Sequence, residues 1–214
     1  LSVKITKKIM YEKKYIQSIN NGLTNSHYKV SGITKNSQDF FNLLIKKTFE
    51  TKKNNGRMFF FGNGASASFS NHMALDWIKN AKVLSYTLSD STFLTALAND
   101  YSYEECFLEF LKMNFPTKND IIITTSSSGN SSNIVKVLEY CKEHQITTLA
   151  LSGLDENNLS NQISEFSLYV PMKTYGMVES IHQIFHHLWF DKFLGVEEWN
   201  REGLQNMNAK DFTL

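Results

Sequence analysis

Apolar and polar positions along the chain follow two different periods. Short apolar runs predict five buried strands, at 57–61, 81–86, 120–125, 147–152 and 166–170. Between and after them, apolar residues recur every three or four positions, as in helices that pack on one side, at 64–78, 90–98, 103–114, 131–143 and 178–194. Strands that alternate with helices indicate βαβ units. We therefore predict an α/β fold, a three-layer α/β/α sandwich with a five-stranded parallel sheet.

Two more helices are predicted ahead of the first strand, at about 9–25 and from Ser37 to about 54. Ser37 is the expected N-cap of the second of these helices. The two helices cannot both bury their faces against one small sheet, so subunit contacts and packing against the same domain both stay open. We divide the chain into N-terminal helices that serve oligomerisation (1–56), the α/β domain (57–194) and a polar C-terminal tail (195–214).

Composition and charge narrow the class of protein. Of the 214 residues, 42% are hydrophobic, which is enough for a large core. The 22 basic and 21 acidic residues form no basic patch, so neither nucleic acid nor a membrane surface is an expected partner. No apolar run reaches the roughly 18 residues of a membrane span. Cys106 and Cys141 lack metal-type spacing and are expected to be reduced, buried thiols, which predicts a cytoplasmic protein.

Two loops of small residues follow the first and third predicted strands, at 62–68 and 124–131. Ligands of parallel sheets bind beyond the carboxyl ends of the strands, where both loops fall. The second loop contains six hydroxyl residues, and hydroxyls beside a helix N-terminus suit a phosphate. The alternative is an ordinary turn with Ser131 as N-cap, but a cap needs only one hydroxyl. The loops match neither the P-loop nor the dinucleotide-binding pattern.

Acid and base groups cluster on two predicted helices. His72 and Asp76 are four residues apart and share a helix face, which is also typical of a surface ion pair. In the last helix, Glu179, His182 and His186 share one face and His187 lies on another. Together the two helices could supply an acid/base pair or a metal site.

Several of these motifs, in this order, resemble the sugar isomerase (SIS) domain family. They are Gly62-Asn63-Gly64-Ala65-Ser66-Ala67, His72, Asn99-Asp100, Ser126-Ser127-Ser128-Gly129-Asn130-Ser131, and Val178-Glu179-Ser180-Ile181-His182 with His187. The likeness spans about residues 37–194. Within the family, the chain resembles the phosphoheptose isomerases, which convert sedoheptulose 7-phosphate to D-glycero-D-manno-heptose 7-phosphate for lipopolysaccharide or capsule.

The resemblance implies a site for a sugar phosphate. It places the phosphate on Ser126, Ser127, Ser128 and Ser131. It adds substrate contacts from Asn63, Ser66, Asn99, Asp100 and Glu179. It also implies proton transfer through an enediol by Asp76 and His187, a zinc ion on His72, Asp76, Glu179 and His187, and a homotetramer.

The chain departs from the family pattern at two positions, where Asp76 replaces a glutamate and Glu179 replaces a glutamine. Helix periodicity favours His186 as the active histidine, whereas the resemblance favours His187. An alternative function is a non-catalytic SIS module that senses a phosphosugar or binds a partner protein such as a replication initiator. Such a module would have little need of His72, Asp76 and His187.

Overall fold

A computed structural model describes the backbone of residues 2–200 and the side chains of residues 10–199. The strands are β1 (His27–Val30), β2 (Ile33–Lys35), β3 (Met58–Gly62), β4 (Ser85–Thr87), β5 (Ile121–Ser126), β6 (Thr147–Ser152) and β7 (Phe166–Tyr169). The α-helices are α1 (Ser2–Thr24), α2 (Ser37–Lys53), α3 (Ala65–Asp76), α4 (Ser91–Asp100), α5 (Cys106–Met113), α6 (Ser132–Glu143), α7 (Leu159–Ile163) and α8 (Tyr175–Leu194). A 3₁₀ turn, Glu198–Asn200, follows α8.

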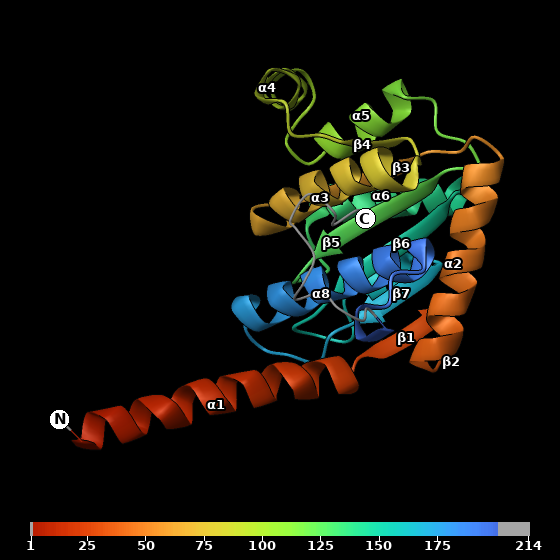
Figure 1. Cartoon of the computed structure of the whole chain (residues 1–214). Helices are drawn as coiled ribbons and strands as arrows, with labels where there is room; N and C mark the ends of the chain where they lie inside the picture. The colour runs from red at the N-terminus through yellow and green to blue at the C-terminus, as the bar shows by residue number, and fades with distance from the viewer. Residues whose placement is uncertain (1, 201–214) are drawn as a thin grey trace.

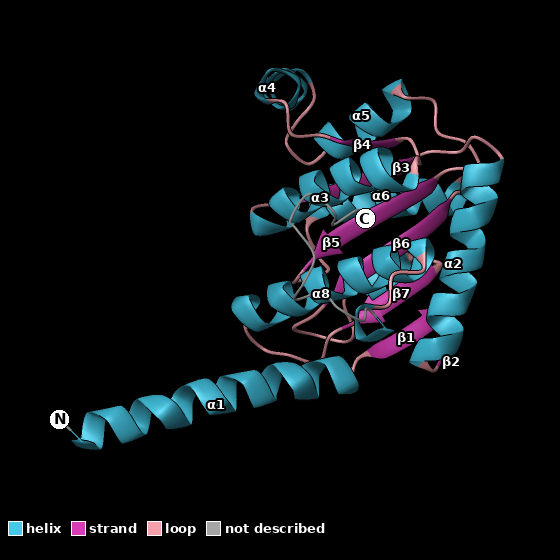
Figure 2. Cartoon of the chain, in the orientation of Figure 1, coloured by secondary structure: helices cyan, strands magenta, loops and turns pink. Residues whose placement is uncertain are grey.

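One sheet runs through the molecule in the order β2-β1-β7-β6-β5-β3-β4 (Figure 1). The five strands β3 to β7 are parallel, and helices cover both faces, which confirms the predicted α/β class (Figure 2). Alternate side chains of each strand enter opposite cores. Phe60 packs with α2, α3 and α8, whereas Phe59 and Phe61 pack with α4, α5 and α6. Each buried Phe stabilises the fold by about 1.5–3 kcal/mol.

The sheet has seven strands where the sequence predicted five. The two additional strands form a hairpin, β1–β2, whose β1 pairs antiparallel with β7. Its turn residues, Ser31 and Gly32, both have positive φ, at 50° and 77°. A two-residue turn of this kind matches the twist of a hairpin, and the Ser-Gly pair was the available signal. Strands of four and three residues, of which only Tyr28 is buried, are too short to give a readable pattern, which is why this hairpin was missed.

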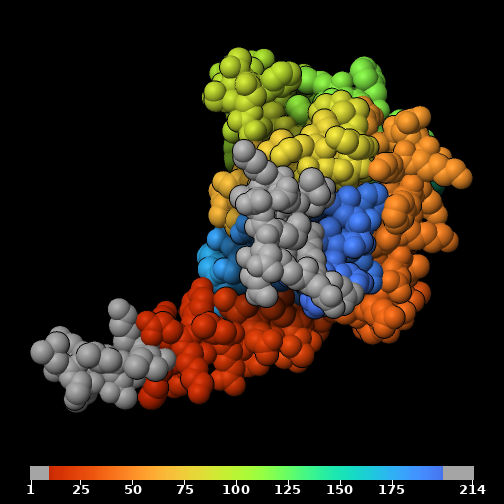
Figure 3. Space-filling model, in the orientation of Figure 1, coloured from red at the N-terminus to blue at the C-terminus, as the bar shows by residue number. Residues whose placement is uncertain are grey.

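The two N-terminal helices differ in how they pack. Helix α2 buries Phe40, Phe41 and Leu44 against the sheet. Its N-cap is Asn36 rather than the predicted Ser37, because the Asn36 side chain accepts a hydrogen bond from the Asp39 amide at 2.8 Å. Helix α1 touches α8 near its C-terminal end and projects from the body of the molecule (Figures 1 and 3). The segment 27–53 therefore shares its sheet and core with the predicted domain, while oligomerisation through residues 1–56 stays a prediction.

Helix α3 leaves its regular geometry immediately after Asp76. It continues as a π-helical turn, Trp77–Ala81, so the strand predicted at 81–86 is only β4. Trp77 is buried against Trp189, with ring centroids 4.5 Å apart, and against Phe190. This aromatic packing joins α3 to α8 directly beside Asp76.

An ion pair fixes the starts of β3 and β5 relative to each other. The carboxylate of Asp120 is buried and accepts hydrogen bonds from the Arg57 amide at 2.7 Å and from its guanidinium at 2.9 Å. Arg57 also donates to the carbonyls of Asn114 and Phe115. Because β3 and β5 are neighbours, this pairing sets the register of the two strands that carry the small-residue loops.

Two smaller expectations concern cysteines and membranes. Cys106 and Cys141 are free thiols buried in the same apolar cluster. Among the residues that the structure describes, no helix combines the length and the apolar character that a membrane span needs.

Candidate active site

The two small-residue loops meet at the carboxyl edge of the sheet. β3 and β5 are paired so that Gly62 lies opposite Thr125. The chain then turns from β3 into α3 and from β5 into α6, which places both helix N-termini at the same edge. The sheet therefore brings together two loops that are about 60 residues apart in the sequence.

The hydroxyls of the serine loop face one another. The Ser126 Oγ lies 3.5 Å from the Ser128 Oγ and 3.4 Å from the Ser131 Oγ, and it accepts a hydrogen bond from the Gly129 amide. Ser131 is at the N-cap position of α6, but its side chain makes no capping hydrogen bond. Ser127 is buried, and its Oγ has no hydrogen-bond partner among the described residues. This geometry favours an anion site over an ordinary capped turn.

Gly129 gives this loop its shape. Its φ is +64°, a conformation that favours glycine, and an added Cβ would lie 2.0 Å from the Asn158 Oδ1. That same Asn158 oxygen caps α7 by accepting from the Asn161 amide. The serine loop is thus packed tightly against the segment that follows β6.

His72, Asp76 and His187 converge between α3 and α8. Their ligand atoms all lie within 4.8 Å of one another. The His72 Nε2 is 3.2 Å from the Asp76 Oδ2, and the rings of His72 and His187 are 5.4 Å apart. Two imidazoles and a carboxylate suit zinc, and three protein ligands leave an open position for substrate. Asp76 is shorter than a glutamate by one methylene, yet it reaches this group.

The neighbouring histidines occupy a different environment. His182 and His186 are buried in the stripe of α8 that faces the sheet. The His182 Nε2 donates to the Ser152 carbonyl at 3.1 Å, and the His186 Nε2 lies 2.9 Å from the Thr125 Oγ1. Burial lowers the pKa of His182 to about 4 and that of His186 to about 3, and for His186 the other two histidines add to this effect. Both rings are therefore neutral packing groups, and the contact with Thr125 holds α8 beside the serine loop.

The buried His182 predicts a loss of stability in acid. Its pKa is about 4 in the folded protein and roughly 6.5 in the unfolded chain, so the unfolded chain binds more protons between these values. The contribution is fully present above pH 6.5 and falls as the pH drops towards 4. Between pH 7.5 and 5.5 this one group should lower the free energy of unfolding by about 1 kcal/mol.

Urea unfolding at both pH values, at matched protein concentration, measures this effect. The control variant is His182→Gln, whose amide can still donate to the Ser152 carbonyl but does not titrate. Between the two pH values, the free energy of unfolding of this variant should fall by about 1 kcal/mol less than that of the wild type. An equal loss in both proteins would contradict the assignment.

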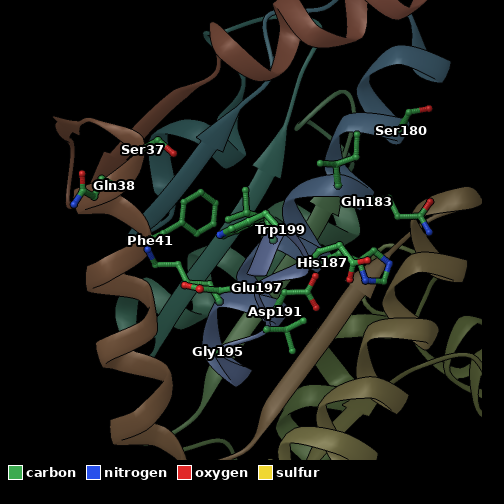
Figure 4. Close-up of a pocket in the computed structure, with 15 residues that line it drawn as sticks. Ser37, Gln38, Phe41, Ser180, Gln183, His187, Asp191, Gly195, Glu197 and Trp199 are labelled. Atoms are coloured by element: carbon green, nitrogen blue, oxygen red, sulfur yellow. The ribbon is translucent and has the colours of Figure 1, made fainter. Parts of the chain in front are cut away.

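A pocket of about 1160 Å³ adjoins this group along α8. His187 and Gln183 project from α8, while Ser37, Gln38 and Phe41 line the opposite side on α2 (Figure 4). Asp191, Glu197 and Trp199 complete much of the wall near the end of α8. His187 therefore faces both the metal-type group and a cavity large enough for a small molecule.

The other residues predicted for the site are not members of the His72–Asp76–His187 group. Ser66 is buried in the first turn of α3, and Asn63 bonds to other side chains of the chain. Asn99 and Asp100 are exposed at the end of α4, where the Asn99 Nδ2 donates to the Asp100 Oδ1. Glu179 lies two helical turns before His187, about 12 Å along the axis, and is not in the His72–Asp76–His187 group. Its roles in substrate and metal binding stay predictions.

Sequence reasoning singled out neither partner of Asn63. These are Asn133, at 3.0 Å, and Tyr103, whose hydroxyl donates at 2.8 Å. Asn133 comes two residues after the serine loop, and that position was the only local signal. Tyr103 comes 40 residues after Asn63, and no spacing rule links the two.

Comparison with known proteins shows the family of this chain. The family model described as "SIS domain" matches residues 23–153. The chain belongs to the SIS domain family. It is 35% identical over 160 residues to the phosphoheptose isomerase of Helicobacter pylori strain Shi470, covering 72% of this chain and 82% of that protein. It is 32% identical over 152 residues to the phosphoheptose isomerase of Aneurinibacillus thermoaerophilus, covering 68% and 75%.

Solved structures show the same SIS fold. The phosphoheptose isomerase of Neisseria gonorrhoeae superposes with a TM-score of 0.74 at 19% identity, covering 88% of this chain and 98% of that one. The sugar isomerase domain of an RpiR transcription factor from Sphaerobacter thermophilus superposes with a TM-score of 0.59 at 14% identity, covering 88% and 89%. The fold thus occurs in an enzyme and in a regulator, so function must be argued from the site.

Proposed function

We propose that the chain is a phosphoheptose isomerase, an aldose–ketose isomerase that converts sedoheptulose 7-phosphate to D-glycero-D-manno-heptose 7-phosphate for heptose synthesis. The observation that carries the proposal is the convergence of His72, Asp76 and His187 beside the serine loop. The names of the similar proteins from Helicobacter pylori and Aneurinibacillus thermoaerophilus support the same reaction. A module that only senses or binds would need no such group, so these residues favour an enzyme.

The serine loop is the proposed phosphate site. Ser126, Ser127, Ser128 and Ser131 supply hydroxyls at the N-terminus of α6, where the helix dipole favours a negative charge. Ser66, Asn63 and the Asn99–Asp100 pair are proposed to contact the rest of the sugar, together with Glu179. Binding through the phosphate would hold the other end of the sugar chain in a fixed orientation for the reaction.

The proposed chemistry moves a proton between two adjacent carbons. Asp76 removes a proton from C1 of the ketose and leaves an enediolate, which becomes the enediol when O2 takes up a proton. His187 delivers a proton to C2, and O1 loses its hydroxyl proton in exchange for the one gained by O2, so the aldose forms with no net gain or loss of atoms. The proton on Asp76 returns to His187 through solvent and resets both groups. A carboxylate has two oxygens, so Asp76 can contact His72 through one and accept a proton on the other.

Zinc is the proposed cofactor. His72, Asp76 and His187 would hold it, with Glu179 as a further predicted ligand. When bound, zinc would act as a Lewis acid toward the substrate oxygens. We also expect a cytoplasmic homotetramer that binds neither nucleic acid nor membranes, and the exposed Met10, Tyr11 and Ile16 of α1 are available for subunit contacts.

Incubation of the purified protein with sedoheptulose 7-phosphate tests the activity directly. We expect the seven-carbon aldose phosphate as product, detected by chromatography with mass spectrometry or by NMR. Treatment with a chelator should lower the rate, and added zinc should restore it. No turnover with or without added zinc would contradict the proposal, and binding without turnover would instead support the non-catalytic module.

A further inference from the structure

A pair of amide side chains joins the two loops of the site. The Asn63 Nδ2 donates to the Asn133 Oδ1 at 3.0 Å, and the Asn133 Nδ2 donates back to the Asn63 Oδ1 at 3.1 Å. Asn63 belongs to the loop after β3, and the buried Asn133 is the second residue of α6, two residues after the serine loop. The reciprocal pair therefore fixes the first loop against the helix whose N-terminus is the proposed phosphate site.

Tyr103 adds a third member from a different segment. Its hydroxyl donates to the Asn63 Oδ1 at 2.8 Å, although the residue is 52% exposed. Partial burial raises the pKa of Tyr103, with Cys106 adding to the rise, so the phenol keeps the proton that it donates. Tyr103 lies in the connection between α4 and α5, three residues after Asp100.

That connection is itself attached to α6. The Lys136 Nζ on α6 pairs with Glu105 and lies 3.7 Å from the Glu104 carboxylate. The Cys106 thiol donates to the Tyr103 carbonyl at 3.1 Å. These contacts hold the segment of Tyr103 against α6, from where its hydroxyl reaches Asn63.

The contacts occupy most of the Asn63 side chain. Both acceptor positions of its oxygen are in use, by Tyr103 and Asn133, and one of its two N–H groups is bonded. Its backbone carbonyl accepts from the Ser66 amide at 3.0 Å and starts the first turn of α3. Asn63 is thus built into the scaffold that presents Ser66.

We propose that Tyr103 is a positioning residue, which acts through Asn63 to hold the Gly62–Ser66 loop in register with the serine loop and with the Asn99–Asp100 pair. Its effect on turnover rests on the proposed function, but its effect on the loop does not. Tyr103 would thereby control how well the phosphate site and the sugar-binding residues are spaced for one substrate molecule. It would do so without touching the reacting atoms.

Tyr103→Phe removes only the hydroxyl and is the test variant. Hydrogen–deuterium exchange at Ser66, Ala67 and Ser68, whose amides bond to Asn63 and Gly64 carbonyls, should become about three- to tenfold faster. The KM for sedoheptulose 7-phosphate should rise by about the same factor while kcat changes less than about twofold. Tyr101→Phe, at an exposed tyrosine two residues away, is the control and should change neither quantity.

A second background shows whether the effect passes through Asn63. In an Asn63→Ala protein, adding Tyr103→Phe should leave the KM and the exchange rates unchanged, because the partner is already absent. Unchanged exchange in the single variant, or an equal effect in both backgrounds, would overturn the inference. If the wild type does not convert sedoheptulose 7-phosphate, the proposed function fails, and the exchange measurement still decides the role of Tyr103.

Discussion

Ser128→Asp is expected to abolish binding of sugar phosphates. The Ser128 Oγ lies in the group of hydroxyls at the N-terminus of α6, 3.5 Å from the Ser126 Oγ. A carboxylate there would stand where the phosphate dianion is proposed to bind. Two unit charges 4 Å apart repel by about 4 kcal/mol near a protein surface, so the affinity should fall by more than about a hundredfold. Isothermal titration calorimetry with sedoheptulose 7-phosphate measures the loss.

Ser128→Asn is the matched control, since it has nearly the same shape as the aspartate and no charge. We expect its affinity to stay within about tenfold of the wild type, because one hydroxyl contributes about 0.5–1.5 kcal/mol. The aspartate variant should fold at least as well as the wild type, since a negative charge stabilises a helix N-terminus. Equal affinities for the two variants would show that the serine loop does not bind the phosphate.

His187→Gln is expected to lower kcat by about 10²–10⁴-fold, the usual contribution of a general acid or base. The variant also removes one of the three grouped donors, so we expect zinc content after dialysis to fall well below that of the wild type. His187 is only partly buried, and its loss should leave the melting temperature nearly unchanged. Steady-state kinetics, metal analysis and a thermal scan give the three readouts.

Two other histidines supply the comparison. His144→Gln changes an exposed ring at the end of α6 and should leave turnover and zinc content at wild-type values. His186→Gln should instead lower stability, because that ring is buried and lies 2.9 Å from the Thr125 hydroxyl. A His187→Gln protein with full turnover would exclude this histidine from the reaction.

Much of the architecture follows from local patterns. Four of the five parallel strands, β3, β5, β6 and β7, coincide with predicted apolar runs, whereas β4 overlaps its predicted run only at residues 85–86. The five helices between and after these strands begin and end within three residues of their predicted bounds. Such runs are readable because side-chain period and apolar content depend on neighbours in the chain. The two small-residue loops were predicted to meet because the carboxyl ends of parallel strands share one edge of the sheet. The hairpin of residues 27–35 was missed because its strands have only four and three residues, which is too few for a readable period.

The choice between His186 and His187 shows where local patterns end. Periodicity correctly grouped His182 with His186, but that stripe is the one that α8 buries against the sheet. The rotation of α8 is set by the packing of Phe185 and Trp189 in the core, and it turns His187 toward His72 and Asp76.

The sequence alone was enough to predict the succession of parallel strands and helices along the chain, the serine loop and the residue types of the site, because these are local properties. The tertiary structure decided which histidine joins Asp76. It also decided that a shortened carboxylate still reaches its partners and that Tyr103 and Asn133 hold Asn63. Each of these depends on contacts between segments 40 to more than 100 residues apart, and such contacts are fixed only when the helices pack on the sheet.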